Sequence, residues 1–191
     1  SSDLGMSSRE VKADEEADGI QKVLIGRDTV AVIVHPENPL QALQTWQIQA
    51  IFLGNIVSWH ELGWTDQPVV VFSREPGSGT RSSFESMIGF AGLLRAGARE
   101  VDGNAAVRAQ VARNPFAIGY VSGGYISPEV KAVAVDGIAP GPLAAAAGRY
   151  SLVRPFYVLY SELSNEARDF LDWVLSAEGQ AIVASGWVSV H

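Results

Sequence analysis

The stretch "SREPGSGTRSSFE", residues 73–85, decides how this chain is folded. It follows the apolar run "PVVVF", and it leads into a segment that places Phe84 and Ile88 four positions apart, as on one side of a helix. An apolar run rich in β-branched residues, a glycine turn and a helical pattern, in that order, predict a buried strand over 68–75, a tight turn at 77–80 and a helix after it.

A turn of this composition is suited to hold an anion. Glycine permits the backbone angles that point successive N–H groups inward, and the start of a helix adds about half a positive charge. Hydroxyl groups supply further donors, and a guanidinium matches the geometry of a tetrahedral oxyanion. The residues that this interpretation assigns to the anion are Arg74, Ser78, Gly79 and Thr80, with Arg81 as a further candidate.

A second interpretation of the same turn stays open. Ser78 or Thr80 fits a simple helix cap, with Arg74 as a surface charge. The flanking arginines favour the anion site. A nucleotide-binding P-loop is excluded because no lysine follows the last glycine, and a nucleophile elbow is excluded because Ser78 lacks the G-x-S-x-G spacing.

Strand-like and helix-like stretches alternate along the rest of the chain, which predicts an α/β fold. The apolar runs are "DTVAVIV" (28–34), "AIGYV" (117–121), "VKAVAV" (130–135) and "LVRPFYVLY" (152–160). The helical patterns lie at 40–53, at 107–113 and from a Ser164 cap onward.

Three details of this pattern predict specific structure. Between residues 40 and 53, apolar residues at steps of three and four predict a helix that buries Leu40, Leu43, Trp46, Ala50 and Leu53 and ends near Gly54. Pro155 predicts an edge strand or a crossing strand. After Ser164, the buried stripe of a helix is predicted to be Ala167, Phe170, Leu171, Val174 and Leu175.

We interpret the tryptophans, Trp46 and Trp173 among them, as packing residues.

Composition excludes several classes of function. The chain has 191 residues and a formal net charge of −7, which argues against a nucleic-acid partner because such partners require a basic surface. It has no cysteine, so disulfides, thiol nucleophiles and thiolate metal sites are excluded. No run approaches the roughly 20 apolar residues that a membrane-spanning helix needs, and we find no signal peptide.

No metal or cofactor is expected from the remaining polar residues. The three histidines, His35, His60 and His191, are scattered and have no second ligand at metal-binding spacing. The acidic run at residues 14–18 lacks the glycine-punctuated loop of a calcium site, so we interpret it as a solvated face.

The whole set of motifs resembles one family, the phosphate-binding proteins of ABC importers within the type 2 periplasmic binding-protein group. The resemblance covers nearly the whole chain, in the family's order. The matching blocks are "DLGMSSRE" (3–10), "GRDTVAVIVHPENPL" (26–40), "IQAIFLGNIVSWHELG" (48–63), "SREPGSGTR" (73–81), "FAIGYVSGGYI" (116–126), "LVRPFYVLYS" (152–161) and "FLDWVLSAEGQAIVASGWV" (170–188).

The resemblance implies two α/β lobes that close on an anion through hinge strands near 29–35 and 152–160. Residues 1–35 would form part of the first lobe and one hinge strand, 36–151 the second lobe, and 152–191 the returning hinge strand and the C-terminal helices of the first lobe. The anion contacts carried over fall on Ser8, with Ser7 beside it, and on the turn and Arg74 in the second lobe.

This chain departs from the family pattern in two places. The family's N-terminal "GSST"-type loop does not precede Ser1, so we expect an incomplete first lobe, whose exposed edge favours a homodimer. Where some phosphate binders carry an aspartate, this chain has Ser8. A serine hydroxyl both donates and accepts, so it discriminates less against sulfate; phosphate is the first choice, with sulfate, molybdate and tungstate left open.

The function expected from all of this is capture without catalysis. No general base, nucleophile or metal group accompanies the turn, so we expect no enzyme activity. The resemblance implies an extracytoplasmic solute-binding protein that serves an ABC permease. The alternative is a sensory or adaptor module of the same fold with weak or no anion binding.

Overall fold

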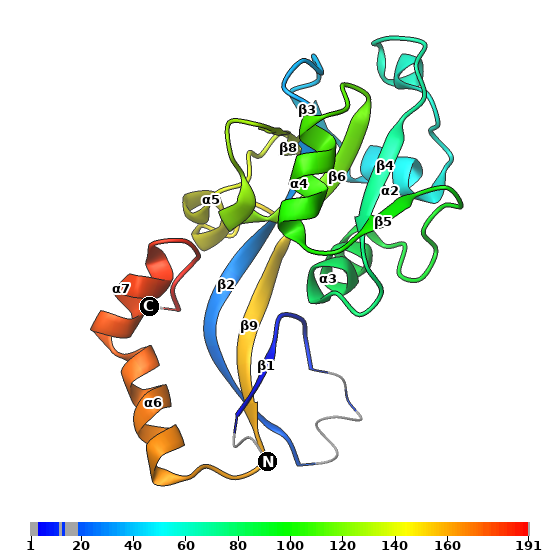
Figure 1. Ribbon diagram of the computed structural model, residues 1–191. Helices are drawn as coiled ribbons and strands as arrows, with labels where there is room; N and C mark the ends of the chain where they lie inside the picture. The colour runs from blue at the N-terminus through cyan, green and yellow to red at the C-terminus, as the bar shows by residue number, and fades with distance from the viewer. Residues whose placement is uncertain (1–3, 12, 14–18, 191) are drawn as a thin grey trace.

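The computed structural model describes residues 4–11, 13 and 19–190, and it shows two unequal parts joined by two long strands (Figure 1). The long strands are β2 (Gln21–Val34) and β9 (Val153–Tyr160), which pair antiparallel with each other. The elements between them in sequence form the large lobe at one end. Strand β1 (Gly5–Ser7) and the two C-terminal helices lie around the other end, which we call the small lobe.

The large lobe contains the remaining strands and most of the helices. Its strands are β3 (Ala42–Leu43), β4 (Val70–Arg74), β5 (Arg99–Val101), β6 (Ala117–Ser122), β7 (Lys131–Ala132) and β8 (Ala134–Val135). Its α-helices are α2 (Thr45–Leu53), α3 (Gly79–Ile88), α4 (Asn104–Ala112) and α5 (Pro142–Ala146). Two short 3-10 helices are η1 (Trp59–Leu62) and η2 (Gly123–Tyr125).

One sheet runs through both lobes in the order β1-β9-β2-β6-β4-β5, with β7 also paired to β2. Strand β2 bends where its pairing with β9 shifts in register, between Leu24 and Gly26. Its C-terminal half, the apolar run predicted at 28–34, is buried. It ends at Val34, two residues before Pro36, because proline cannot continue the ladder. The sheet therefore provides a continuous mechanical link between the lobes.

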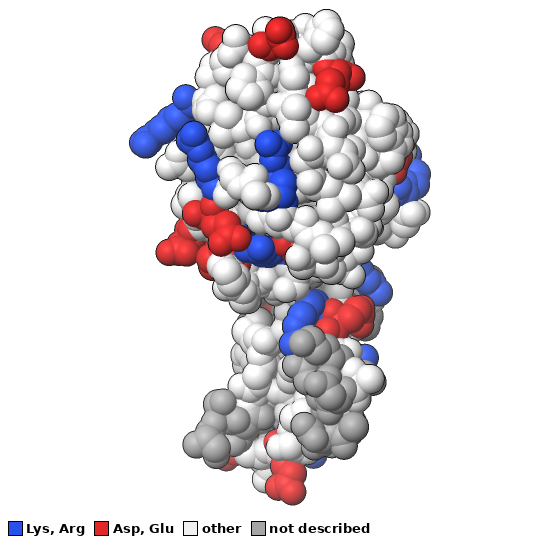
Figure 2. Space-filling view, turned by 90° about the vertical axis from the view of Figure 1, so that its right-hand side faces the viewer, with Lys and Arg blue, Asp and Glu red and all other residues white. Residues whose placement is uncertain are grey.

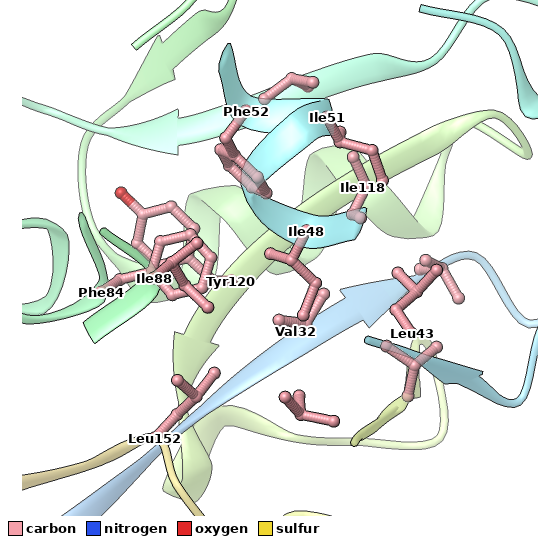
Figure 3. Packing of buried hydrophobic residues seen from close by; sticks show 14 of the residues in the cluster. Val32, Leu43, Ile48, Ile51, Phe52, Phe84, Ile88, Ile118, Tyr120 and Leu152 are labelled. Atoms are coloured by element: carbon pink, nitrogen blue, oxygen red, sulfur yellow. The ribbon is translucent and has the colours of Figure 1, made fainter. Parts of the chain in front are cut away.

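Helices cover both faces of the sheet in the large lobe. Val30, Val32 and Val34 of β2 point to the face under α2 and α3, and Ala31 and Ile33 point to the face under α4, as the two-residue period of a strand requires. Figure 3 shows the first of these cores, where side chains of α2 meet those of β2 and β6. The predicted strand-turn-helix at 68–90 and the α/β class are confirmed.

The predicted helix at 40–53 is wrong in its first turn and at Trp46, whereas its predicted end at Gly54 is confirmed and the other predicted residues are buried or pack against the core. Residues 42–43 form β3, which pairs with β8, and the helix begins at Thr45. At this start the side chain of Asp136 accepts hydrogen bonds from the Thr45 N–H and hydroxyl, at 2.8 and 2.6 Å, and the Gln47 side chain accepts the Gln44 N–H at 2.8 Å. The helix buries Ile48, Ile51 and Phe52, while Trp46 is 62% exposed, so its interpretation as a packing residue is also wrong.

The C-terminal segment forms two helices. Helix α6 (Asn165–Leu175) begins at the predicted Ser164 cap, whose hydroxyl accepts the Ala167 N–H at 3.2 Å. Ser176 ends it and caps α7 (Ala177–Ala184). Of the predicted stripe, Phe170 is 49% exposed; Trp173, predicted to pack, is 43% exposed.

Strand β9 is the crossing strand that Pro155 predicts. It lies between β1 and β2, but β1 pairs only with residues 157–159. At Pro155 the described part of β9 is therefore paired on the β2 side alone, which tolerates a residue without an N–H.

Candidate functional site

The turn between β4 and α3 leaves backbone donors free at the start of a helix. Gly77 has a φ of 87°, a conformation that glycine adopts without strain, and Ser78 then caps α3 by accepting the Arg81 N–H at 3.3 Å. Within the described ranges, the N–H groups of Gly79 and Thr80 have no hydrogen-bond partner. These groups lie at the positive end of the helix dipole, which favours a negative charge nearby.

Arg74 lies at the end of β4 and is buried, with 8% of its surface exposed. Its Nε and Nη2 donate to the two carboxylate oxygens of Glu75, at 2.8 and 2.7 Å. Its Nη1 donates to the Thr80 hydroxyl at 3.3 Å, which places the guanidinium beside the start of α3. The surface-charge interpretation of Arg74 is therefore wrong, whereas the cap interpretation of Ser78 and the anion site are compatible.

Glu75 holds Arg74 in place. The hydrogen bonds from Arg74 lower the pKa of Glu75 to about 2, and a further bond from the Gly103 N–H, at 3.2 Å, acts in the same direction. Glu75 therefore stays ionised at neutral pH. It fixes the plane of the guanidinium and neutralises much of its charge.

Tyr120 supports the end of β4 from the neighbouring strand β6. Its hydroxyl lies 2.8 Å from the Ser73 hydroxyl and accepts the Arg74 N–H at 3.3 Å. Burial raises the pKa of Tyr120, so it remains a neutral phenol. Its ring stacks on Phe84 of α3 with centroids 4.0 Å apart, which ties the helix to the strand that carries Arg74.

Arg81 points away from Thr80 toward β5. Its Nε donates to Glu85 at 2.7 Å, and its Nη1 donates to Glu100 at 2.6 Å and to the Arg74 carbonyl at 2.9 Å. These three partners account for the orientation of its guanidinium. The structure therefore does not bring the Arg81 side chain to the turn, although its N–H contributes to the Ser78 cap.

Ser8 comes to the turn from the small lobe. A Cβ placed on Gly79 would overlap the Ser8 hydroxyl, so the two residues are in direct contact. The Ser8 carbonyl also accepts a hydrogen bond from the Ser83 hydroxyl of α3 at 3.0 Å. Ser7 behaves differently: its hydroxyl donates to the Arg9 carbonyl at 3.0 Å, and Ser7 borders a mainly apolar cavity of about 390 Å³ beside Phe156 and Trp187.

The structure thus brings together Arg74, Ser78, Gly79, Thr80 and Ser8 from two lobes, and we call this group the cradle. Sequence reasoning missed the supporting residues Tyr120 and Ser83. For Ser83 a signal exists, because it lies four residues after Gly79 and so on the same face of α3. Tyr120 offers no such signal, because only the strand order places it beside Arg74.

A buried ion pair lies at the junction of the lobes. Arg154 of β9 donates from Nε and Nη2 to Asp28 of β2, both to Oδ2, at 2.9 and 2.8 Å. Only 5% of Arg154 and 1% of Asp28 is exposed. Asp28 therefore links its strand to the other hinge strand.

The described part of the chain lacks a metal-binding group and a membrane-spanning helix. It contains no group of three or more His, Cys, Asp or Glu residues arranged to hold a metal ion. None of its helices combines the length and the apolar character needed to cross a bilayer. The acidic run at 14–18 lies outside the described residues.

Comparison with known proteins places the chain among binding proteins. Residues 1–178 match the model of the PBP superfamily domain. The phosphate-binding protein PstS of Pseudomonas aeruginosa is 32% identical over 93% of this chain and 63% of its own length. PstS of Bacillus subtilis is 29% identical over 92% of this chain and 61% of its own length. The chain therefore spans less than two thirds of these relatives.

Solved structures agree in fold over the whole chain. A protein from Clostridium perfringens, assigned as a phosphate ABC transporter substrate-binding protein and solved with bound phosphate, is 40% identical with a TM-score of 0.94. It is matched over 100% of this chain and 80% of its own. An ABC-type phosphate transport receptor from Vibrio cholerae is 30% identical with a TM-score of 0.87, over 97% of this chain and 79% of its own.

Proposed function

The chain belongs to the PBP superfamily domain family, and from that premise we propose that it captures inorganic phosphate in the cradle. One arrangement carries the proposal: Glu75 holds the Arg74 guanidinium at the start of α3, where the N–H groups of Gly79 and Thr80 are free of partners among the described residues. A fixed cation, a helix start and several hydroxyls together match a tetrahedral oxyanion.

Each cradle residue has a separate role in this proposal. Arg74, although paired with Glu75, supplies the Nη1 donor and the remaining positive charge beside the Thr80 hydroxyl. The amides of the first helical turn and the hydroxyls of Ser78 and Thr80 supply hydrogen bonds, and Ser8 approaches from the small lobe. Arg81 and Ser7 stay in the predicted set only as neighbours, because their side chains are bonded elsewhere.

Capture rather than turnover is the activity that fits this site. The relatives are named as phosphate-binding proteins or as a phosphate ABC transporter substrate-binding protein. We extend to this chain the role of an extracytoplasmic solute-binding protein that delivers its ligand to an ABC permease. The lobe boundaries near residues 35 and 152 stay a prediction.

Two finer predictions accompany this function. Ser8 makes the site permissive, so sulfate, molybdate or tungstate binds in addition to phosphate, but more weakly. Strand β1 is an edge of the described sheet and carries Met6, which is 78% exposed, so we keep the prediction that the chain self-associates through this lobe.

Titration calorimetry of the chain with phosphate, then with sulfate, tests the proposal. Heat of binding with phosphate, at an affinity above that for sulfate, supports it. No heat at millimolar phosphate contradicts it and favours the adaptor alternative.

A further inference from the structure

Ser83 forms a hydrogen bond that joins the two lobes away from the hinge strands. It lies in α3, and its hydroxyl donates to the Ser8 carbonyl at 3.0 Å. Only 8% of Ser83 is exposed, so this donor is held in a nearly buried position. The bond connects residues that are 75 positions apart in sequence, one in the large lobe and one beside β1 in the small lobe.

Helix α3 contacts Ser8 at two points. Gly79 and Ser83 are four residues apart, so they share one side of the helix, about 6 Å apart along its axis. Gly79 lies against the Ser8 hydroxyl, where an added Cβ would overlap it, and Ser83 binds the Ser8 carbonyl. One contact holds the side chain and the other holds the backbone. Together they fix how the Ser8 hydroxyl is presented to the start of α3.

The strand before Ser8 does not by itself hold this residue in place. Strand β1 ends at Ser7, whose partner on β9 is Tyr157, so Ser8 lies beyond the last assigned pair. The Ser7 hydroxyl bonds to the Arg9 carbonyl, which is a contact within the same short segment. A segment beyond the paired part of its strand opens locally at low cost unless other contacts hold it. The bond from Ser83 is such a contact.

The shape of the molecule gives this bond a measurable effect. Figure 2 shows that the lobes are joined at a narrow waist, and in Figure 1 the chain rises at the end of β1 toward the underside of α3. When the lobes separate, water replaces both partners of the bond. A neutral hydrogen bond that forms only in the closed arrangement therefore raises the ratio of closed to open molecules by about fivefold.

We propose that Ser83 is a positioning residue for the cradle. By binding the Ser8 carbonyl, it holds the small lobe against the start of α3, and it thereby sets how long a captured phosphate stays bound. Ser83 acts through Ser8 and requires no contact with the anion. This inference rests on the proposed function, since it assigns a residue that governs release from the same site.

Phosphate association and dissociation rates of the natural chain and of Ser83→Ala test this inference. The variant removes the donor, and alanine is a good helix former, so we expect α3 to fold. Dissociation should be about fivefold faster, while the association rate stays within about twofold, because the bond forms only after the lobes meet. Ser86→Ala, at an exposed serine of the same helix, is the matched control and changes neither rate. A purely structural role would lower the free energy of unfolding without this split between the rates.

A second measurement needs no phosphate. Since the chain has no cysteine, Leu93→Cys in the large lobe and Asp169→Cys on α6 provide two exposed sites for spin labels. Double electron–electron resonance then reports the distances between the lobes in the ligand-free protein. Adding Ser83→Ala should lower the ratio of short to long distances by about fivefold, and adding Ser86→Ala should leave it unchanged.

Two results overturn the inference. One is a folded Ser83→Ala protein that releases phosphate at the rate of the natural chain. The other is a set of distances between the lobes that Ser83→Ala leaves unchanged. Failure of the natural chain to bind phosphate removes the proposed function instead, and the ligand-free distances then still decide whether Ser83 holds the lobes together.

Discussion

Arg74 and Glu75 are neighbours in sequence, and their side chains nevertheless form a two-point ion pair, with N–O distances of 2.8 and 2.7 Å. Consecutive residues of a strand point to opposite faces, so this pair is possible only because β4 ends at Arg74 and the backbone turns at Glu75. The pair fixes the guanidinium at the start of α3 before any ligand arrives. Such preorganisation reduces the entropy lost on binding.

The Glu75 pair predicts a specific acid sensitivity. Its pKa is about 2 in the folded protein and near 4.5 in the unfolded chain, so the pair stabilises the fold above pH 4.5 and loses this contribution as the pH falls toward 2. Urea unfolding at pH 7 and pH 3 measures the loss. The Glu75→Gln variant should lose less stability than the natural chain between these pH values, by on the order of 1–2 kcal/mol after solvent screening.

Glu37→Gln, which removes an exposed carboxylate, is the control for that experiment and should follow the natural chain. If Glu75→Gln and the natural chain lose the same free energy of unfolding between pH 7 and pH 3, the Arg74–Glu75 ion pair does not stabilise the fold.

Gly79→Ala is predicted to impair binding without impairing folding. Gly79 is the first residue of α3, where alanine is a better helix former, so the free energy of unfolding should stay equal or rise slightly. The added methyl group would overlap the Ser8 hydroxyl and keep the lobes apart. We expect phosphate affinity to fall by at least tenfold, measured by calorimetry.

The double variant Gly79→Ala/Ser8→Gly removes the overlap and should recover part of that affinity. Gly124→Ala, at a glycine with open space around it, serves as the matched control. Equal phosphate affinity in Gly79→Ala and the natural chain would show that the lobes do not close at this contact.

The Asp28–Arg154 pair predicts a large stability effect at the hinge. Asp28→Asn leaves a buried guanidinium without its counter-charge, so we expect a loss of about 3–5 kcal/mol in the free energy of unfolding. Chemical denaturation measures it, with the exposed Asp172→Asn as the control. A change below about 1 kcal/mol would mean that water solvates this arginine in the folded protein.

The sequence predicts the cradle well because the cradle is local. Strand, turn and helix follow one another within 73–85, and the residue types that permit the turn are also those that bind an anion. The α/β class likewise follows from alternating apolar patterns, whose burial is visible in β2.

The parts that sequence reasoning missed depend on distant segments. Asp136 lies 91 residues from Thr45 in sequence and accepts its N–H at the start of α2, and Trp46, the next residue, is exposed. Arg154 pairs with Asp28, which lies 126 residues away in sequence. The Tyr120 hydroxyl accepts the Arg74 N–H because β6 lies beside β4 in the sheet. Apolar residues repeated every three or four positions predict a helix, but they do not predict which distant residues contact it. These contacts could therefore be identified only from the structure.

Phosphate titration of Arg74→Ala is the most direct test of the central claim, with Arg113→Ala, at an exposed arginine of the same lobe, as the control. Because Arg74 is the buried cation of the cradle, its loss should lower phosphate affinity at least a hundredfold, while Arg113→Ala binds as the natural chain does. Undiminished binding by a folded Arg74→Ala protein would contradict the account and place the anion elsewhere.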